Sequence, residues 1–310
     1  MLSPVPPSSA ISVSGLVKRY GDRAVVDGLD LEVKTGEVFA FLGRNGAGKT
    51  TTIEILEGYR TRDAGEVSVL GVDPAHGDGA WRARIGMVLQ QSQPVGTLTV
   101  TEILRLYAAY FPRTRPVDDV IALVGLQEKS GERASRLSGG QLRRLDVAVA
   151  LVGDPELLFL DEPTTGFDPD ARRMFWDVIS GLRETGTTIF LTTHYMDEAE
   201  ALADRVGILR DGHIVALGTA PELQAQRGGV EIRFVLPSGV TPADLPNLSG
   251  AGTRAGEEMR ISTTAPTADL AVLCGWAAGK GIELASLSVQ RPSLEDVFLA
   301  IAGNDAAVGS

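Results

Sequence analysis

The residues best suited to chemistry form a glycine-rich stretch at positions 43–50, with the pattern Gly, four residues, Gly-Lys-Thr. An apolar run at residues 38–42 predicts a buried strand before it, and residues 51–56 are predicted to begin a helix. Glycine lets the backbone fold closely around an anion, and the unpaired N–H groups at a helix start attract phosphate. In that setting Lys49 would reach the β- and γ-phosphates of a nucleoside triphosphate, and the Thr50 hydroxyl would ligate Mg²⁺. The residues predicted to surround the phosphates are Gly43, Asn45, Gly46, Ala47, Gly48, Lys49, Thr50 and Thr51.

Two neighbouring acids, Asp161 and Glu162, follow a continuous apolar run at residues 157–160. Such a run is typical of a parallel strand that is buried on both faces. A carboxylate at the carboxyl end of a strand suits Mg²⁺, which prefers oxygen ligands, so Asp161 is predicted to bind the metal. Glu162 would point in another direction and would accept a proton from an attacking water.

A second helix start suited to phosphate lies at residues 137–141, with the sequence Leu-Ser-Gly-Gly-Gln. Ser138 is a good N-cap residue, and Gly139 and Gly140 leave bare N–H groups with no side chain to block an anion. One nucleotide needs only one such site. Either two phosphates bind, or the second helix start faces a nucleotide that is held by another copy of the protein.

Three further residues lie where a ligand could bind. His194 follows an apolar strand, and ligands gather at the carboxyl ends of strands in an open parallel sheet. Gln90 ends another apolar run and could reach a metal or a water. Tyr20 lies at the turn of an antiparallel β segment predicted at residues 11–33, where its ring could stack on a base. The phosphate loop, the two acids and His194 are predicted to meet in one site.

Each motif also has a plainer interpretation when it is taken alone. The glycine-rich loop could be a turn with a solvated lysine, and the two acids could cap a helix after a strand. The second helix start could be an ordinary cap, Tyr20 an ordinary strand residue, and Gln90 a solvent-facing loop residue. The strand–loop–helix order around the first loop, and the presence of that loop ahead of the acids, favour the nucleotide hypothesis for these two motifs.

The composition of the 310-residue chain favours a globular protein with a sizeable core, since 44% of its residues are hydrophobic. The net charge is −11 with no long basic run, which argues against direct binding of nucleic acid. The single cysteine, Cys274, excludes an intrachain disulfide and is expected in the core. No apolar run approaches the roughly 20 residues that span a bilayer, so the chain is not expected to cross a membrane by itself.

The pattern predicts two domains. Residues 11–227 carry all the candidate site residues, and their part at about residues 91–153 is predicted to be helical. Residues 230–303, which follow a diglycine, are predicted to form a small α+β accessory domain. Residues 1–10 lack the basic start and apolar core of a signal peptide and are expected to be a disordered tail, and residues 304–310 are expected to be a tail.

One helix of the predicted helical part has a clear start and a clear apolar face. Thr99 and Glu102 have the spacing of a capping box. Helical periodicity then puts four large side chains on one face, which is expected to lie in the core. These four residues are Ile103, Leu106, Tyr107 and Tyr110.

The order of these motifs resembles the ATP-binding-cassette (ABC) family over about residues 11–225. Residues 43–50 resemble the Walker A loop, residues 157–162 the Walker B strand, and residues 137–141 the LSGGQ signature. The single residues that match further motifs are Gln90 for the Q-loop, Asp168 for the D-loop, His194 for the switch histidine and Tyr20 for the A-loop aromatic. The resemblance implies an α/β fold: a P-loop NTPase core with a small antiparallel β subdomain and an α-helical subdomain, joined to the small C-terminal α+β domain.

The resemblance implies that a head-to-tail homodimer hydrolyses ATP. Lys49 and its loop would hold each ATP on one subunit, with Tyr20 stacked on the base. The residues implied to contact the same ATP from the other subunit are Ser138, Gly139, Gly140, Gln141 and Asp168. The implied Mg²⁺ ligands are Thr50, Gln90 and Asp161. The implied catalytic residues are Glu162, His194 and Gln90. Glu162 would polarise the attacking water, Gln90 would reach the metal or this water, and His194 would contact the γ-phosphate.

The end of the chain gives a narrower resemblance. Residues 292–298, Pro-Ser-Leu-Glu-Asp-Val-Phe, resemble the end of the extra domain in daunorubicin/doxorubicin-resistance-type exporter ATPases, the soluble halves of ABC-2-type transporters. This implies a subunit that powers export of drugs or other hydrophobic compounds. It would lie at the cytoplasmic face of the membrane, bound to a separate transmembrane permease of ABC-2 type in two copies.

Two other classes compete with the exporter hypothesis. A soluble ABC ATPase that acts on ribosomes or DNA would typically carry two cassettes with a charged linker, or a long coiled-coil insertion, and the sequence has neither. A P-loop GTPase would need an Asn/Thr-Lys-x-Asp segment that reads guanine, and the sequence has none after the loop. The soluble ABC ATPase stays as the alternative.

Overall fold

The computed structural model describes residues 9–88, 96–226, 229–237, 239–290 and 292–303. The chain divides into two compact units, residues 1–219 and 220–310, and each is described by itself. The division falls earlier than the expected end of the first domain at residue 227, because α8 (Ala220–Gln226) packs with α10 (Leu294–Gly303) of the second unit. Gln90 lies outside the described residues.

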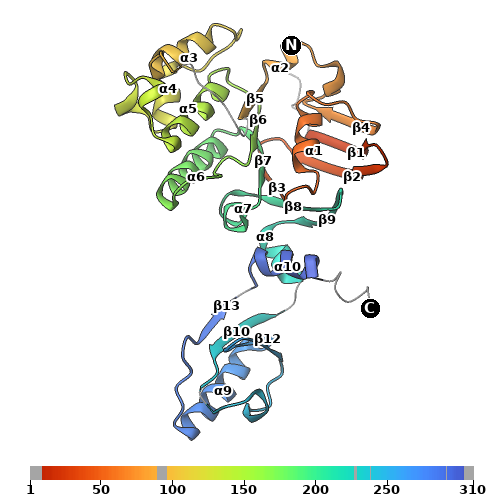
Figure 1. The fold of residues 1–310 in the computed structure, drawn as a ribbon, viewed down its shortest axis with the longest axis vertical. Helices are drawn as coiled ribbons and strands as arrows, with labels where there is room; N and C mark the ends of the chain where they lie inside the picture. Colours follow the sequence, from red (N-terminus) through yellow and green to blue (C-terminus); the bar gives the residue numbers. More distant parts are fainter. Residues whose placement is uncertain (1–8, 89–95, 227–228, 238, 291, 304–310) are drawn as a thin grey trace, which may run out of the picture. The chain divides into compact units, whose positions relative to one another are not determined.

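A six-stranded sheet forms the centre of the first unit, in the order β5-β6-β7-β3-β8-β9 (Figure 1). Its strands are β3 (Val38–Gly43), β5 (Ile85–Val88), β6 (Leu157–Asp161), β7 (Thr188–Thr193), β8 (Arg205–Arg210) and β9 (His213–Gly218). All neighbouring strands are parallel except β8 and β9, which form an antiparallel hairpin. Every residue of β3, β6 and β7 is buried, as their continuous apolar runs predict.

The parallel register brings three strand ends together at one edge of this sheet. β7 lies between β6 and β3, with Thr192 opposite Asp161 and Thr193 opposite Leu42. β3 leads into the phosphate loop, β6 ends at Asp161, and β7 ends directly before His194. The predicted convergence of the loop, the acids and the histidine is therefore confirmed.

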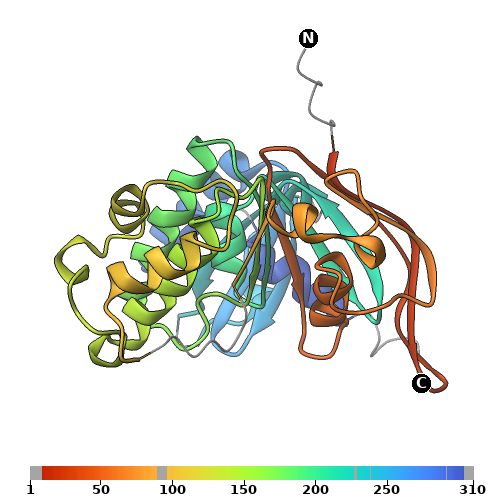
Figure 2. The ribbon, with the colours of Figure 1, turned by 90° about the horizontal axis from the view of Figure 1, so that it is seen from above.

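A three-stranded antiparallel sheet lies beside α1 (Lys49–Leu56), the helix that follows the phosphate loop, on the side away from the central sheet (Figures 1 and 2). It has the order β2-β1-β4, and its strands are β1 (Ser9–Tyr20), β2 (Arg23–Lys34) and β4 (Ala64–Val69). The expected turn follows Tyr20, so the predicted hairpin is confirmed. Leu16, Leu29 and Val67 from this sheet join the same hydrophobic core as Phe39 and Phe190 of the central sheet.

The helices of the first unit divide between the two sides of the central sheet (Figure 2). They are α1 (Lys49–Leu56), α2 (Gly79–Arg82), α3 (Val100–Ala108), α4 (Val117–Leu123), α5 (Gly139–Leu151), α6 (Pro169–Glu184) and α7 (Met196–Leu202). α3, α4 and α5 pack together and form the predicted helical part, and α5 contacts β5. The capping box between Thr99 and Glu102 at the start of α3 is confirmed.

The expected core face of α3 is wrong for three of its four residues. Leu106 is 41% exposed, Tyr107 37% and Tyr110 76%, whereas Ile103 is buried. The helix packs with Val100, Ile103 and Leu104 inward, and it ends at Ala108 before Tyr110. Periodicity identified a large apolar stripe, but the neighbouring helices cover only its edge.

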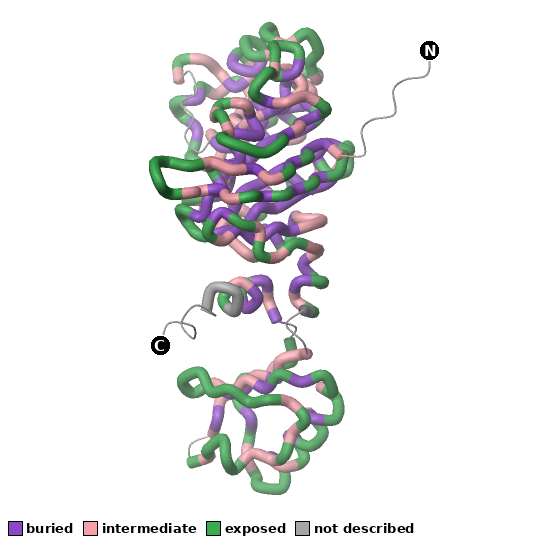
Figure 3. Tube along the Cα trace, turned by 90° about the vertical axis from the view of Figure 1, so that its right-hand side faces the viewer, coloured by how far each residue is buried: buried purple, intermediate pink, exposed green. Residues whose placement is uncertain are grey.

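The second unit is a small α+β domain whose sheet has the order β11-β12-β10-β13. Its elements besides α8 and α10 are β10 (Val230–Val235), β11 (Ala251–Ala255), β12 (Glu258–Thr263), α9 (Pro266–Lys280) and β13 (Ser288–Gln290). Ile232, Phe234, Met259 and Ile261 form its core with Leu273 of α9. Figure 3 shows buried residues gathered within each unit. Cys274 of α9 is exposed, so its expected place in the core is wrong.

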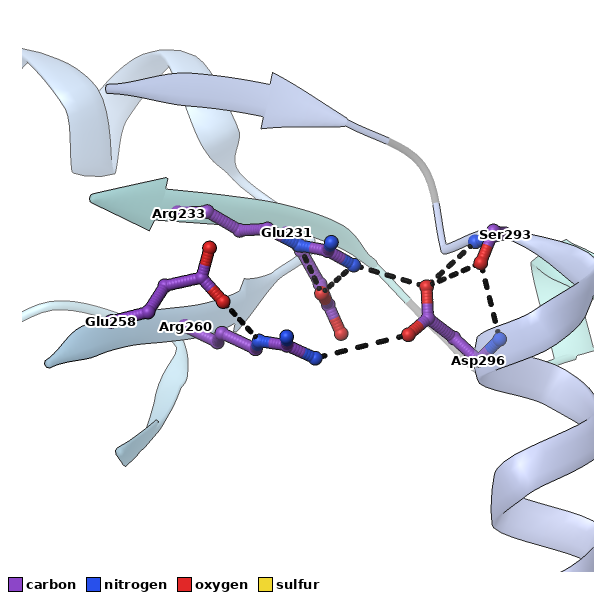
Figure 4. Close-up of polar contacts among 6 residues, drawn as sticks. All are labelled: Glu231, Arg233, Glu258, Arg260, Ser293 and Asp296. Atoms are coloured by element: carbon purple, nitrogen blue, oxygen red, sulfur yellow. Dashed lines mark hydrogen bonds and ion pairs between the residues drawn. The ribbon is translucent and has the colours of Figure 1, made fainter. Parts of the chain in front are cut away.

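An ion-pair cluster on the polar face of this sheet holds the start of α10 (Figure 4). Arg233 Nη2 lies 3.0 Å from Asp296 Oδ2 and 2.7 Å from Glu231 Oε2. The Ser293 hydroxyl donates a 2.7 Å hydrogen bond to the same Asp296 oxygen, and Arg260 lies 3.9 Å from the other one. Burial acts to raise the pKa of Asp296, but the hydrogen bond from Ser293 and the charge of Arg233 outweigh it and hold the pKa below its ordinary value.

We expect Asp296→Ala to destabilise the second unit by about 1–3 kcal/mol, because it leaves Arg233 and the Ser293 cap without their shared acceptor. Urea unfolding followed by a probe in the second unit measures this loss. The exposed neighbour Glu295→Ala is the matched control and should change stability little. An equal loss in both variants would contradict a special role for the cluster.

Candidate nucleotide site

The phosphate loop has the backbone that the sequence predicts. Gly46 and Gly48 adopt positive φ angles of 82° and 109°. A Cβ atom on Gly48 would lie 2.6 Å from the carbonyl oxygen of Val25, so this position requires glycine. Gly48 caps α1 without a side-chain hydrogen bond, and the first turn of α1 holds no acid that would compete with a phosphate.

An open pocket of about 250 Å³ lies in front of this loop. Its lining residues are Val25, Asn45, Gly46, Gly48, Lys49, Thr50, Thr51 and Glu162. Most of the predicted loop residues are thus brought together with Glu162 from the end of β6. Gly43 and Ala47 do not line the pocket, although the Gly43 carbonyl accepts a 2.8 Å hydrogen bond from Lys49 Nζ.

Glu162 bridges two of the predicted functional side chains. Lys49 Nζ, whose side chain is only 5% exposed, lies 3.3 Å from Glu162 Oε1. His194 Nδ1 lies 3.3 Å from the other carboxylate oxygen, Oε2. Lysine, glutamate and histidine therefore form one connected row, although they come from α1 and the segments after β6 and β7.

The two acids point in different directions, as predicted. Asp161 is buried and accepts a hydrogen bond from the Thr192 hydroxyl on β7. The backbone N–H of Glu162 donates to the Thr192 carbonyl oxygen and hydroxyl, both at 3.1 Å. Glu162 has a φ of 44°, in the left-handed region that non-glycine residues rarely adopt. This turn directs Glu162 toward Lys49 while Asp161 stays against the sheet.

The surroundings of Asp161 suit a cation. Burial raises the pKa of the Asp161 carboxyl, and the nearby charge of Glu162 adds to the shift. Burial also raises the pKa of Glu57, at the end of α1, to about 8, with the charges of Asp161 and Glu54 adding to the shift. Among the described residues no cluster of three or more His, Cys, Asp or Glu side chains could hold a metal by itself. Mg²⁺ commonly takes only one or two protein carboxylates, with phosphate and water as its other ligands.

The second helix start does not belong to this pocket. Ser138 and Gln141 form a reciprocal capping box, with Gln141 N 3.3 Å from Ser138 Oγ and Ser138 N 2.9 Å from Gln141 Oε1. The predicted cap is therefore confirmed. Ser138 and Gly139 are exposed, and a Cβ on Gly139 would meet no atom within 4 Å. None of the residues Ser138, Gly139, Gly140 and Gln141 lines the pocket within one chain.

Two other predicted ligand residues also lie outside the pocket lining. Asp168 is the N-cap of α6, where its side chain accepts a 2.7 Å hydrogen bond from Ala171 N. Tyr20 is 45% exposed, and Lys18 Nζ and Arg60 Cζ lie 5.8 and 5.5 Å from its ring centroid. Its predicted stacking on a base, like the roles of Gln90, stays a prediction.

Sequence reasoning missed the residues that support the acids from behind. Arg143 of α5 is buried and donates to the Pro163 carbonyl at 3.0 Å and to the Asp161 carbonyl at 3.2 Å. Burial lowers the pKa of this guanidinium, and the charges of Asp146 and Asp161 act against that. The sequence signal was its place on the face of α5 that also carries the buried residues Val147, Ala150 and Leu151. Arg143 thus links α5 to the segment that carries Asp161 and Glu162.

A phosphate loop between a strand and a helix, with acids at the adjacent strand end, defines a nucleoside triphosphatase of the P-loop class. The ABC transporter family profile matches residues 26–165, and a profile for the C-terminal domain of ABC transporter domain-containing-protein-like chains matches residues 230–293. None of the described helices is long and apolar enough to cross a membrane.

Similar proteins extend over nearly the whole chain. The daunorubicin resistance ATP-binding protein DrrA3 of Streptomyces coeruleorubidus is 38% identical over 97% of this chain and 98% of its own length. The linearmycin resistance ATP-binding protein LnrL of Bacillus subtilis is 34% identical over 94% and 98%. Among solved structures, cbiO1 of Clostridium perfringens, part of the cbiONQ ABC transporter complex, has a TM-score of 0.64 at 26% identity over 71% of this chain and 92% of that chain. The chain belongs to the ATP-binding subunits of ABC transporters, which bind and hydrolyse ATP.

The buried carboxyl of Glu57 gives a pH-dependent prediction. Its pKa in the folded protein, about 8, lies above the ordinary value of 4.5, so the folded state loses stability as the pH rises from about 4.5 to about 8. Glu57→Gln removes that loss, and its advantage over the parent should be below about 1 kcal/mol at about pH 5 and a few kcal/mol at about pH 9. Thermal unfolding of the nucleotide-free protein at the two pH values measures the difference.

The matched control for this prediction is Glu66→Gln, which changes an exposed carboxyl on β4. It should shift stability similarly at both pH values. A Glu57→Gln variant whose advantage did not grow with pH would contradict the assignment of a buried, neutral carboxyl.

Proposed function

We propose that this chain is the ATP-hydrolysing subunit of a membrane exporter and that it works as a head-to-tail pair. The observation that carries the proposal is the division of the site. Lys49, Thr50 and Glu162 line one pocket, whereas Ser138 and Gly139 present an open, capped helix start outside it. One chain thus offers two halves of a triphosphate site that do not meet within it.

The lysine side binds the phosphates. The loop N–H groups and Lys49 hold the β- and γ-phosphates, and the γ-phosphate displaces Glu162 as the partner of Lys49. Thr50 and Asp161 are suited to hold Mg²⁺, together with Gln90, and the metal supplies charge neutralisation at the phosphates. Glu162, released from Lys49, orients the attacking water and accepts its proton, while His194 donates to the γ-phosphate.

The start of α5 in a second copy, at Ser138, Gly139 and Gly140, closes the site. The Ser138 hydroxyl and the first-turn N–H groups of Gly139 and Gly140 lie at the dipole end that attracts an anion, and the partner copy's ATP supplies that anion. Asp168 lies at the neighbouring turn and approaches the same nucleotide. Dimeric ABC cassettes are among the solved relatives of similar fold, which supports this arrangement.

The transport role rests on the relatives. Several of them are named for drug resistance or for Nod factor export, and their similarity covers both units of this chain. We infer a separate transmembrane permease of ABC-2 type, in two copies, with this subunit bound at the cytoplasmic face of the membrane. The alternative, a soluble ATPase that acts on ribosomes or DNA, is less favoured because the net charge is −11.

We expect Glu162→Gln to bind ATP with unchanged affinity, to hydrolyse it at least about 100-fold more slowly, and to form a stable ATP-bound dimer. The variant loses the general base but keeps the groups of both copies that bind the triphosphate. Phosphate release and light scattering measure the two effects. Normal hydrolysis would contradict the role of Glu162, and a strictly monomeric ATP-bound variant, alone and with its permease, would contradict the paired site.

We expect Lys49→Ala to weaken ATP binding by at least about tenfold, because the phosphates lose their only buried cation within the described pocket lining. Isothermal titration with ATP measures the affinity. The matched control Lys34→Ala removes an exposed lysine at the end of β2 and should bind ATP normally. Unchanged affinity in Lys49→Ala would contradict the assignment of the phosphate loop.

The exporter role is tested by co-expression with the candidate permease. The two proteins should co-purify, and transported drug-like compounds should raise the ATPase rate of the complex but not that of the isolated subunit. ATPase stimulation by ribosomes or DNA instead would favour the alternative class.

A further inference from the structure

A contact behind the site connects α6 to the residue next to His194. The Arg172 guanidinium carbon lies 4.1 Å from the centroid of the Tyr195 ring. Arg172 Nη1 also donates a 3.2 Å hydrogen bond to Asp197 Oδ2, in the first turn of α7. The guanidinium is thus held from two sides, over one ring and bonded to one carboxylate. Such a cation–π contact is favoured because the ring face is electronegative.

Tyr195 also contacts His194, a residue of the site. Its ring centroid lies 4.1 Å from that of His194, with the planes tilted by 38°. His194 Nδ1 in turn lies 3.3 Å from Glu162 Oε2. A continuous row of contacts therefore runs from Arg172 through Tyr195 and His194 to Glu162, and none of its members except Glu162 lines the phosphate pocket.

A buried acid lies where α7 packs against α6. Glu198 of α7 is fully buried, and the groups that interact with it are Thr193, Thr164 and Trp176, with the charge of Arg172 close by. None of these contacts has the geometry of a full hydrogen bond, since both Glu198 carboxylate oxygens lack a partner among the described residues. Removing the Arg172 charge would leave this carboxylate less compensated.

The position of Arg172 ties it to the turn before α6. Asp168 caps α6 with its side chain, and its carbonyl oxygen accepts a 3.0 Å hydrogen bond from the Arg172 N–H. A movement of this turn therefore moves Arg172, and with it the ring of Tyr195. In the proposed pair this turn approaches the partner copy's nucleotide, and a shift of the turn on closure would reach Arg172 through α6.

We propose that Arg172 is a positioning residue for ATP hydrolysis, which sets the orientation of His194 by stacking on Tyr195. In this orientation His194 and Glu162 can act in hydrolysis once the turn before α6 contacts the partner copy. This inference rests on the proposed roles of His194 and Glu162, and it adds a residue that touches neither the nucleotide nor the reacting atoms.

The test compares Arg172→Ala and Tyr195→Ala with the parent in the full chain. Both variants should lower kcat for ATP about tenfold while KM changes less than about twofold, since a misplaced catalytic group slows the chemical step without weakening binding. Arg173→Ala is the matched control, because it removes the same charge from an exposed position of the same helix, and it should hydrolyse ATP at the parent rate. Tyr195→Phe keeps the ring and should recover most of the rate that Tyr195→Ala loses.

A double-mutant cycle separates the stack from a general loss of stability. The Arg172→Ala/Tyr195→Ala double variant should lose no more activity than either single variant, because the two changes break one contact. Additive losses, a Tyr195→Phe rate as low as that of Tyr195→Ala, or parent rates in both alanine variants would each overturn the proposal. If Arg172→Ala does not fold, the two Tyr195 variants test the same contact from the other side.

The failure of this inference is distinguishable from failure of the proposed site. His194→Ala and Glu162→Gln, assayed in parallel, test the site without touching Arg172 or Tyr195. Loss of hydrolysis in those two variants with parent rates in Arg172→Ala would reject only the positioning role. Parent rates in His194→Ala and Glu162→Gln would reject the site itself.

Discussion

The parallel pairing of β6, β7 and β3 is the constraint on which the site depends. A slip of one residue in this register would turn every side chain to the opposite face, and Asp161 would lose Thr192 as its neighbour. The middle strand acts as the template, because Thr192 binds both Asp161 and the backbone of Glu162. Since β7 also leads to His194, one strand fixes three of the predicted functional residues at once.

The backbone of Glu162 shows how two adjacent acids take different tasks. On a regular strand they would point to opposite faces of the sheet, and only one would reach the strand end. The left-handed φ of 44° costs on the order of 1 kcal/mol and turns Glu162 out of the strand toward Lys49 and His194. Arg143 holds the carbonyls of Asp161 and Pro163 on either side of this turn, which keeps the strained residue in place.

The sequence predicted the parts of this structure that depend on local patterns. The buried strands, the glycine-rich loop, the caps at Thr99 and Ser138, and the hairpins follow from periodicity and turn residues, and they are confirmed. It failed where the neighbours decide, as for Tyr110 and Cys274, because periodicity identifies a face and not what covers it. The strand β11 escaped notice because all five of its residues are exposed.

The supporting residues escaped prediction for a related reason. Arg143 and Arg172 are charged residues in helices, and composition places such residues at the surface. The tertiary structure decides what each one contacts, since it sets the guanidinium against a particular carbonyl or ring. The two arginines lie on different helices, α5 and α6, and these helices begin at the two turns that the proposed pair presents to a partner copy. Closure of the pair would therefore act on Glu162 from both sides, through Arg143 on its backbone and through Tyr195 and His194 on its carboxylate.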